Sequence, residues 1–588
     1  MQKTQMTNEQ IAAYLEEIGV LMRLAGENDF RASAFDRAAR TIEALDTPIS
    51  QLVEAEKLTE IKGIGKSIAK DIYALSETGT IPVLEDLREK VPDELKEWLR
   101  ISGLGPKKIY KIHHELDITT IDELKDKCRD GSVAGLSGMG KKSAEKILKS
   151  IEWMEQFSER CRLDEAAHIA DHIYEDLKDH PAVQQISVAG SLSRWKETIG
   201  DIDILIAAEP AEAGPIFDLF TQNEQVVEVL GRGETKSSVR TEQGRQVDLR
   251  VVKPAEFPAA LMYFTGSKEH NVVMRQRARD RGLSLNEYGL FKLDENKETD
   301  FNQTLTSESE KEIYSHLELG WVPPELREDR GEFEWFEQNE TIELVKSEDI
   351  KGVLHAHSTW SDGKKSIAEM AKACIDRGYE YLGISDHSQS AAYAGGLKPD
   401  DIRRQWEEID ELNQQFADEG TNFLIFKGIE SDILSDGSLD YDSALLDGFD
   451  FVIASIHSGL QMNRDAQMAR FKAAIEHPAT RIIGHPTGRL LLQRDGSDLD
   501  VSRIIEWAAE HNTAIEINAN PMRLDLDWRH GQKALECGLK TAICPDAHTT
   551  EGIDHIHYGV QIARKAWFEK ERVLSSFSAE ELRGFWGE

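Results

Sequence analysis

The sequence predicts a multidomain α/β protein with helical domains at the N-terminus, a mixed β-sheet in the middle and a (β/α) barrel at the C-terminus. Three observations lead to this prediction. A Gly-x-Gly turn followed by a helix occurs three times before residue 150, and two apolar strands near 201–207 and 246–252 carry aspartates. Strand-like runs then alternate with helices after residue 350. The chain has 588 residues, a length that accommodates about four domains.

Composition excludes several classes of protein. Hydrophobic residues make up 40% and charged residues 30% of the chain, which is ordinary for a soluble globular protein. No run approaches the roughly 18 apolar residues of a membrane span, and the first residues are unlike a signal peptide. The five cysteines are scattered without a CxxC pair, so no disulfide framework or zinc knuckle is indicated. We therefore expect a cytoplasmic protein with no membrane segment.

The three Gly-x-Gly repeats lie at 58–72, 99–112 and 135–148. Residues 101–150 carry ten Lys and Arg against seven Asp and Glu, although the net charge of the chain is −37. A glycine turn lets the amides of the following helix approach a phosphate. One such turn is usually only a turn, but three with the same flanks resemble helix-hairpin-helix motifs, which grip a nucleic-acid backbone without reading its sequence. The glycines expected at DNA are Gly63, Gly65, Gly103, Gly105, Gly138 and Gly140.

Two aspartates stand at the start of an apolar strand in the middle of the chain. Asp201 and Asp203 in "GDIDILIAA" are two residues apart, so they point to the same side of a strand. Their charges repel, and a shared Mg²⁺ or Mn²⁺ relieves that repulsion. The alternative is a strand end at which both carboxylates face water. Asp248, inside the apolar run "QVDLRVV", would complete a cage for two metals if it lies near the first pair.

Residues 1 to about 325 resemble a bacterial family X DNA polymerase of the polymerase-beta superfamily. The matching motifs are Gly190-Ser191 followed by Arg194, Gly200-Asp201-Ile202-Asp203, Asp248 in "VDLRVV", and "YFTGS" at 263–267. The resemblance implies a monomeric DNA-directed DNA polymerase that fills short gaps in base excision repair. Its partners would be gapped or nicked DNA and dNTPs, and its three aspartates would hold two Mg²⁺ or Mn²⁺ ions. The implied nucleotide-binding residues are Gly190, Ser191, Arg194, Gly200, Tyr263, Phe264, Gly266, Asn271 and Arg275.

The sequence departs from this family at two places. Ser193 and Trp195 flank Arg194 where the family often has an arginine and a glycine. Asp71 stands where members with 5′-deoxyribose-phosphate lyase activity have a Schiff-base lysine. An amine nucleophile is required for that reaction, and the neighbouring Lys66 and Lys70 would point elsewhere on the helix. We therefore expect weak lyase activity or none.

The C-terminal half predicts a metal-binding barrel. Its strand-like runs end in "HAH", "DHS", "GIE", "SIHS", "GHP" and "DAH", and the sites of (β/α) barrels lie at the C-terminal ends of strands. A single histidine there is usually structural, but ligand-type residues follow nearly every strand. Imidazole mixed with carboxylate suits Zn²⁺, Mn²⁺ or Fe²⁺, with up to three ions. The nine candidate ligands are His355, His357, Asp362, His387, Glu430, His457, His485, Asp546 and His548.

These spacings resemble the PHP (polymerase and histidinol phosphatase) domain, a distorted seven-stranded (β/α) barrel. The resemblance implies metal-dependent phosphoester hydrolysis, and fusion to a polymerase favours a 3′→5′ exonuclease or a related DNA 3′-end phosphoesterase. Two alternatives stay open: a non-catalytic PHP scaffold for the polymerase, or a PHP phosphatase with a DNA-binding arm. Asp386, beside His387, is a candidate for orienting the imidazole instead of binding metal.

The predicted domain boundaries follow from these motifs and from an acidic, Pro- and Glu-containing stretch after residue 320. Successive segments are assigned to an N-terminal helical domain of the 8 kDa type with one hairpin, fingers with two hairpins, a nucleotidyltransferase palm, a thumb, a linker, the PHP domain and a C-terminal tail. The corresponding ranges are 1–90, 91–150, 151–260, 261–325, 326–349, 350–575 and 576–588.

Overall fold

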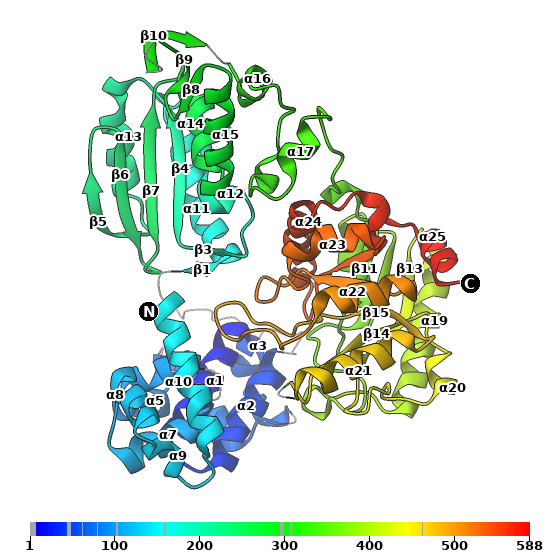
Figure 1. Cartoon of the computed structure of the whole chain (residues 1–588). Coiled ribbons are helices and arrows are strands. Elements are labelled where there is room, and N and C mark those ends of the chain that lie inside the picture. The colour runs from blue at the N-terminus through cyan, green and yellow to red at the C-terminus, as the bar shows by residue number, and fades with distance from the viewer. Residues whose placement is uncertain are drawn as a thin grey trace. The chain divides into compact units, whose positions relative to one another are not determined.

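A computed structural model describes residues 8–43, 49–61, 63–78, 80–101, 104–157, 160–294, 299–305, 308–460 and 462–587. The chain divides into two compact units, Met1–Ser158 and Glu159–Glu588. The first is helical, and the second contains two larger sheets and the helices that cover them (Figure 1). None of the helices in the described ranges is both long and apolar enough to span a membrane.

The helical unit confirms the predicted helical N-terminus. Its helices share a single apolar core that includes the fully buried Leu15, Phe35, Trp98 and Ile109. Helices α4, α7 and α10 begin directly after the three glycine turns. The helices are α1 (Asn8–Leu24), α2 (Asp29–Glu43), α3 (Ile49–Glu54), α4 (Lys66–Thr78), α5 (Pro82–Lys90), α6 (Asp93–Glu97), α7 (Pro106–Leu116), α8 (Ile121–Arg129), α9 (Ser132–Gly135) and α10 (Lys141–Phe157).

The second unit begins with a five-stranded mixed sheet of order β2-β4-β7-β6-β5. β4 and β7 are parallel, and the other neighbours in the sheet are antiparallel. Its strands are β2 (Gln185–Val188), β4 (Asp201–Ala207), β5 (Val226–Arg232), β6 (Lys236–Thr241) and β7 (Gln246–Val252). A separate two-stranded sheet pairs β1 (Cys161–Arg162) with β3 (Thr198–Ile199). The helices are α11 (Leu163–Lys178), α12 (Gly190–Ser193), α13 (Ala213–Thr221), α14 (Phe257–Thr265) and α15 (Lys268–Asp280).

Most of strand β4 is buried on both faces of the sheet, and alternate side chains along it pack against different neighbours. Ile202, Ile204 and Ile206 join the large core that contains the apolar faces of α11 and α13. Leu205 and Ala207 pack instead against Phe257 and Ala260 of α14. Because side chains alternate along a strand, Asp201 and Asp203 lie on the α14 face of the sheet.

The segment after the sheet is packed rather than being the linker that its acidic composition predicts for 326–349. Arg327 is fully buried and pairs with Glu310 at 2.6 Å, while buried Glu332 contacts His270 at 2.8 Å. The backbone at 345 bonds to Phe568 of the barrel. Arg327 and Glu332 are thus paired inside the fold, whereas other charged residues of the stretch, such as Glu334 and Glu337, are exposed. The elements here are β8 (Leu283–Asn286), β9 (Gly289–Leu293), β10 (Thr299–Leu305), α16 (Glu310–His316), η4 (Pro324–Leu326) and α17 (Glu332–Phe336).

The C-terminal part is the predicted seven-stranded parallel barrel. Its strands follow sequence order from β11 to β17, and a bridge between Ala356 and Ala547 brings the first and last strands together. The strands are β11 (Gly352–Ala356), β12 (Tyr381–Ile384), β13 (Leu424–Asp432), β14 (Phe451–Ser455), β15 (Thr480–Ile483), β16 (Ala514–Asn518) and β17 (Thr541–Cys544). The helices are α18 (Ile367–Asp376), α19 (Pro399–Glu419), α20 (Ser443–Leu446), α21 (Arg464–Glu476), α22 (Val501–Glu510), α23 (Gly531–Glu536), α24 (Ile556–Lys565) and α25 (Ala579–Trp586).

The inside of the barrel is apolar at one end and carries ligand-type residues at the other. Leu354, Phe426 and Phe451 form the apolar part together with Leu582 and Trp586 of α25. The Trp586 ring stacks on Phe451 at 5.4 Å. The segment 576–588, predicted as a tail, therefore contains a helix that fills the base of the barrel.

Replacement of Arg327 tests the packing of segment 326–349. Arg327→Met leaves Glu310 without its guanidinium partner, so we expect a loss of about 3–5 kcal/mol in stability, the usual result of breaking a buried pair. The matched control is Arg240→Met, because the Arg240–Glu228 pair is largely exposed and contributes about 0–1 kcal/mol. Urea unfolding followed by circular dichroism measures both, and equal losses would contradict the buried-pair assignment.

Candidate functional site

Three aspartates meet at one end of the palm sheet. The parallel pairing of β4 with β7 sets Asp203 directly beside Asp248, and one oxygen from each of Asp201, Asp203 and Asp248 lies within 4.8 Å of the others. Burial together with the charges of Asp201 and Asp248 raises the pKa of Asp203 to about 6. Crowding of this kind is relieved by a divalent cation with oxygen ligands, so the group fits a metal site.

Asp248 is held ionised by its neighbours. Burial opposes its charge, but hydrogen bonds from Lys236, Ser238 and Gln246 lower the pKa of Asp248. The Lys236 Nζ lies 2.6 Å from Asp248 Oδ2, and Gln246 Nε2 donates to Oδ1 at 3.0 Å. These bonds fix the orientation of the carboxylate.

Gly190 is required at its position above Asp203. Its φ is +68°, and a Cβ there would stand 2.4 Å from Asp203 Oδ2. The glycine therefore lets α12 begin directly against the carboxylate, and Ser191 follows in the same helix. Arg194, just after α12, donates from Nη1 to the carbonyls of Gly190 and Thr265. It thus connects α12 to the end of α14.

The other predicted nucleotide residues surround the end of α14. The rings of Tyr263 and Phe264 meet edge to face at 5.3 Å, and the amide of Asn271 donates to Tyr263 O at 2.7 Å. Arg275 donates from Nε to Asn271 O at 3.3 Å. A Cβ at Gly266 would stand 2.7 Å from the Asn271 side chain. The Asn271 amide therefore anchors the turn after α14.

Gly200, the remaining predicted nucleotide residue, lies directly before β4. A Cβ at Gly200 would stand 3.3 Å from Arg160 Nη1.

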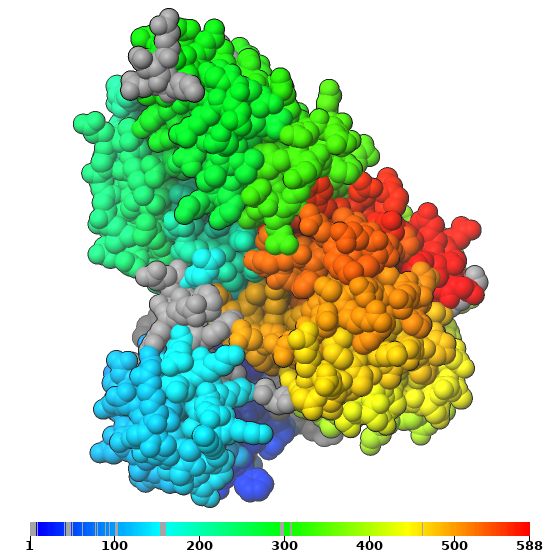
Figure 2. Space-filling model, in the orientation of Figure 1, coloured from blue at the N-terminus to red at the C-terminus, as the bar shows by residue number. Residues whose placement is uncertain are grey.

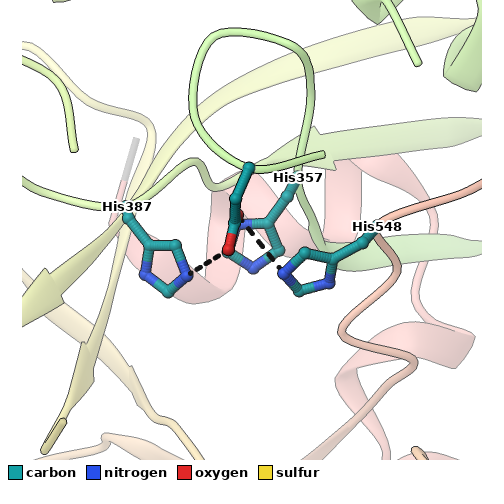
Figure 3. A group of neighbouring side chains, drawn as sticks. His357, His387 and His548 are labelled. Atoms are coloured by element: carbon teal, nitrogen blue, oxygen red, sulfur yellow. Dashed lines mark ion pairs between the residues drawn. The ribbon is translucent and has the colours of Figure 1, made fainter. Parts of the chain in front are cut away.

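A bulge in β11 places two histidines inside the barrel. The pairing of β11 with β12 gains one residue between Val353 and Ala356. As a result, His355 and His357 both face inward after Leu354, and each is fully buried. Figure 3 shows the rings of His357, His387 and His548 projecting toward a common space from three separate segments. Asp362 lies 3.7 Å from His387 Nε2 and 3.3 Å from His548 Nε2.

Glu430 is the centre of the barrel cluster. It projects from β13, its side chain is 1% exposed, and its carboxylate lies within 4 Å of five imidazoles, at distances from 2.9 to 3.8 Å. Burial opposes the charge of Glu430, but the electrostatic effect of His457, His355 and His387 holds its pKa well below the usual range. Asp546 completes the group at 3.2 Å from His357 Nε2. The five histidines are His355, His357, His387, His457 and His485.

Two acidic residues that orient imidazoles were not recognised in the sequence. Glu516 Oε1 accepts from His355 Nδ1 at 2.6 Å, and Asp432 contacts His457 Nδ1. Strand alternation was the sequence signal that could have revealed them. Glu516 lies between inward-facing Ala514 and Asn518, and Asp432 follows Glu430 by two residues. Asp386 does not orient an imidazole: its carboxylate accepts from Ser358, Ser361 and Gln405. It therefore shapes the loop after β11.

The barrel cluster fits bound metal ions. Ring nitrogens of four buried histidines, His355, His357, His387 and His485, have no hydrogen-bond partner. Buried polar atoms are rarely left unpaired, and imidazole with carboxylate is the donor set of Zn²⁺, Mn²⁺ and Fe²⁺. Three overlapping groups of ligand atoms are close enough to hold an ion: His357–Asp362–His387–His548, His355–His357–Glu430 and His387–Glu430–His457.

The glycine turns of the helical unit leave backbone open where the sequence predicts phosphate contacts. A Cβ at Gly65, Gly105, Gly138 or Gly140 would meet nothing within 4 Å. Gly63 and Gly138 have φ of +105° and +79°, a region that favours glycine. Gly103 lies outside the described residues. The predicted lyase position, Asp71, is half-buried on α4.

Family comparisons match four segments of the chain. Residues 6–81 match a helix-hairpin-helix domain, 95–152 a SAM-like helix-hairpin-helix tandem, 260–328 the DNA polymerase beta thumb and 354–520 the PHP domain.

Similar curated proteins cover the whole chain or its halves. The DNA polymerase/3′-5′ exonuclease PolX of Bacillus subtilis (strain 168) is 42% identical over 583 residues, 99% of each chain. DNA polymerase lambda of Rattus norvegicus is 24% identical over 56% of this chain and 57% of its own length. A probable phosphatase of Thermoanaerobacter sp. (strain X514) is 27% identical over 39% of this chain and 91% of its own.

The overlap of the three ligand groups predicts unequal effects on metal content. Glu430 belongs to two groups and Asp362 to one, so we expect Glu430→Ala to lower the bound transition metal more than Asp362→Ala does. Mass spectrometry of the purified variants measures the ions per chain. Asp436→Ala, an exposed aspartate, is the control and should keep the wild-type content. Equal losses at Glu430 and Asp362 would contradict the shared role of Glu430.

Proposed function

Because the chain belongs to the bacterial family X DNA polymerases that carry a C-terminal PHP domain, we propose that it fills short gaps in DNA and removes nucleotides from 3′ ends at a second site. Membership follows from 42% identity over 99% of both chains. The observation that carries the proposal is the presence of two separate clusters of metal-ligand type, the aspartate trio of the palm and the histidine-rich cluster of the barrel.

In gap filling, Asp201, Asp203 and Asp248 hold two Mg²⁺ or Mn²⁺ ions, which, when bound, favour ionisation of the primer 3′-hydroxyl and offset the charge of the triphosphate. Ser191 and Arg194 hold the β- and γ-phosphates of the dNTP, and the planar guanidinium spreads their charge. Tyr263 and Phe264 line the sugar. Asn271 and Arg275 face the nascent base pair and the template. The helix N-termini after the glycine turns grip the DNA backbone.

In 3′-end removal, the nine barrel residues hold up to three Mn²⁺, Zn²⁺ or Fe²⁺ ions, which, when bound, activate the attacking water and neutralise the phosphodiester. Glu516 and Asp432 keep His355 and His457 oriented. Arg523, whose Nε lies 3.8 Å from Asp546, provides a cation for the substrate phosphate. Water is consumed and the terminal nucleotide leaves as its monophosphate. Asp71 supplies no amine, so the proposal includes no lyase step.

The loop between Ser390 and Leu397 lies at the rim of the barrel site. It supports a DNA end as the substrate in preference to a small phosphomonoester. Tyr393 stands at its tip, 75% exposed, with its ring 6.3 Å from that of His387. The base of the loop is anchored: Tyr441 donates to Leu397 O at 2.6 Å, and Ser390 donates to Asp432 at 2.7 Å. A fixed, exposed aromatic ring offers a surface on which an unpaired base stacks.

Two other functions are less well supported. A scaffold without catalysis does not require nine ligand-type residues at the strand ends, four of which are histidines with ring nitrogens that have no hydrogen-bond partner. A small-molecule phosphatase with a DNA-binding arm gives no use to the aspartate trio. We propose gapped or nicked DNA and dNTPs as the partners of a monomeric enzyme that acts in the cytoplasm.

The two sites should be separable by substitution. Asp203→Ala removes a ligand of both palm metals, so we expect primer extension to fall by several orders of magnitude while 3′-end degradation persists. His357→Ala or His548→Ala should have the opposite effect. A 5′-labelled duplex with a one-nucleotide gap, incubated in Mn²⁺ with and without dNTPs, reports both reactions on one gel. Degradation that is lost in Asp203→Ala and kept in the histidine variants would place the nuclease in the palm.

Substitution of Tyr393 tests the choice of substrate. Base stacking on an aromatic side chain contributes about 1–3 kcal/mol, so Tyr393→Ala should raise KM for a single-stranded tetranucleotide about tenfold or more and Tyr393→Trp should not. Hydrolysis of a tetramer of abasic tetrahydrofuran nucleotides, which has no aromatic ring, should not change. Tyr288→Ala, an exposed tyrosine elsewhere, is the control. Equal losses on both substrates would show that Tyr393 acts on the site itself rather than on the base.

A further inference from the structure

The carboxylate of Glu328 joins the palm to the barrel. Its Oε1 lies 3.1 Å from Arg194 Nε and 2.7 Å from Lys565 Nζ, and Lys196 Nζ lies 3.9 Å from Oε2. Arg194 follows α12 of the palm, Glu328 follows η4, and Lys565 ends α24 of the barrel. Figure 2 shows the light green surface of the segment after the thumb directly beside the orange and red surface of the barrel.

Lys565 is an unusual residue because its ammonium group is fully enclosed. Its side chain is 0% exposed, and its Nζ also donates to Glu325 O at 3.1 Å and lies 4.2 Å from the centre of the Trp528 ring. Burial lowers the pKa of Lys565 to about 8, while Glu328 acts in the opposite direction. A buried lysine without a carboxylate would lose its charge, so Lys565 and Glu328 depend on each other.

Arg194 depends on the same carboxylate. Its Nη1 bonds go to the neutral carbonyls of Gly190 and Thr265, and its Nε bond goes to Glu328. Because Glu328 shares its single negative charge among Arg194, Lys565 and the more distant Lys196, the four groups together retain a net charge of +2. That charge stands beside the helix that begins over Asp203, where a triphosphate would lie.

We propose that Lys565, a residue of the PHP barrel, is a positioning residue for nucleotide incorporation, acting through Glu328 to orient Arg194 and to keep its charge available to the dNTP. The inference rests on the proposed role of Arg194 at the nucleotide phosphates. It makes the barrel a functional part of the polymerase site in addition to its own hydrolytic role. Without Lys565, Glu328 shares its charge only with Arg194 and the more distant Lys196, and its carboxylate is free to rotate away from the observed geometry.

Lys565 has a matched control in the preceding residue. Arg564 pairs with Glu325 at 2.6 Å and donates to Val345 O at 3.0 Å, so it spans the same interface through other partners. Single-nucleotide gap filling by the full chain, with dNTP varied, should show KM raised about tenfold in Lys565→Met, the effect of losing one charge-assisted bond. We expect a smaller change in kcat, partial rescue in Lys565→Arg, and KM within about twofold of wild type in Arg564→Met.

Further variants separate this inference from the proposed function. If Arg194→Ala leaves the dNTP KM unchanged, the nucleotide role of Arg194 is wrong. If Arg194→Ala raises KM but Lys565→Met does not, or Arg564→Met raises it equally, the positioning role of Lys565 is overturned. Lys565→Gln, a second neutral variant, serves if Lys565→Met does not fold, as judged by its melting curve and tetranucleotide hydrolysis. It should raise KM in the same way, and an unchanged KM in Lys565→Gln would also overturn the proposal.

Discussion

Crowding of acidic side chains in one place, with at least one of them buried, is the constraint on which both sites depend. A carboxylate that leaves water needs a cation or hydrogen-bond donors. In the barrel, Glu430 receives five imidazoles from strands that are distant in sequence, so the parallel strand order is what brings its partners together. In the palm, a single parallel strand pair brings Asp203 and Asp248 side by side. The fold places these side chains close together. The concentrated charge that results is what makes both clusters suited to metal ions.

Sequence patterns predicted the features that depend on residue periodicity. They did not predict the features that depend on tertiary packing. The strand alternation around Asp201 and the ligand-type residues at strand ends indicated the two clusters. The bulge in β11 was not predictable from the sequence. An extra residue in a strand leaves the apolar composition of the segment unchanged, and only the pairing with the neighbouring strand reveals it. The stretch 326–349 was misjudged because its charges indicate solvent, whereas Arg327 pairs with Glu310 inside the fold. Asp386 was assigned by its neighbour His387, but its carboxylate instead accepts from Ser358, Ser361 and Gln405, which tertiary packing brings to it.

The boundary between palm and barrel includes a cluster of charges around one aromatic ring. Trp528 donates to Glu197 at 3.1 Å, Arg529 pairs with the same carboxylate at 2.7 Å, and Lys196 and Lys565 lie over the Trp528 ring. Such contacts are directional, so they define one arrangement more strongly than an apolar patch of equal area. Structural support and catalysis are therefore compatible roles for the barrel.

The helix at the base of the barrel has a consequence for how the protein is made. Each strand from β11 to β17 pairs with its predecessor in the chain, but closure needs the last strand beside the first, and Trp586 must then fill the interior against Phe451. Domains of a nascent chain generally fold in order of emergence from the ribosome. The barrel site thus forms only after α25 has left the ribosome, later than the aspartate trio of the palm. A growing polypeptide gathers the palm carboxylates before it can close the barrel around Glu430.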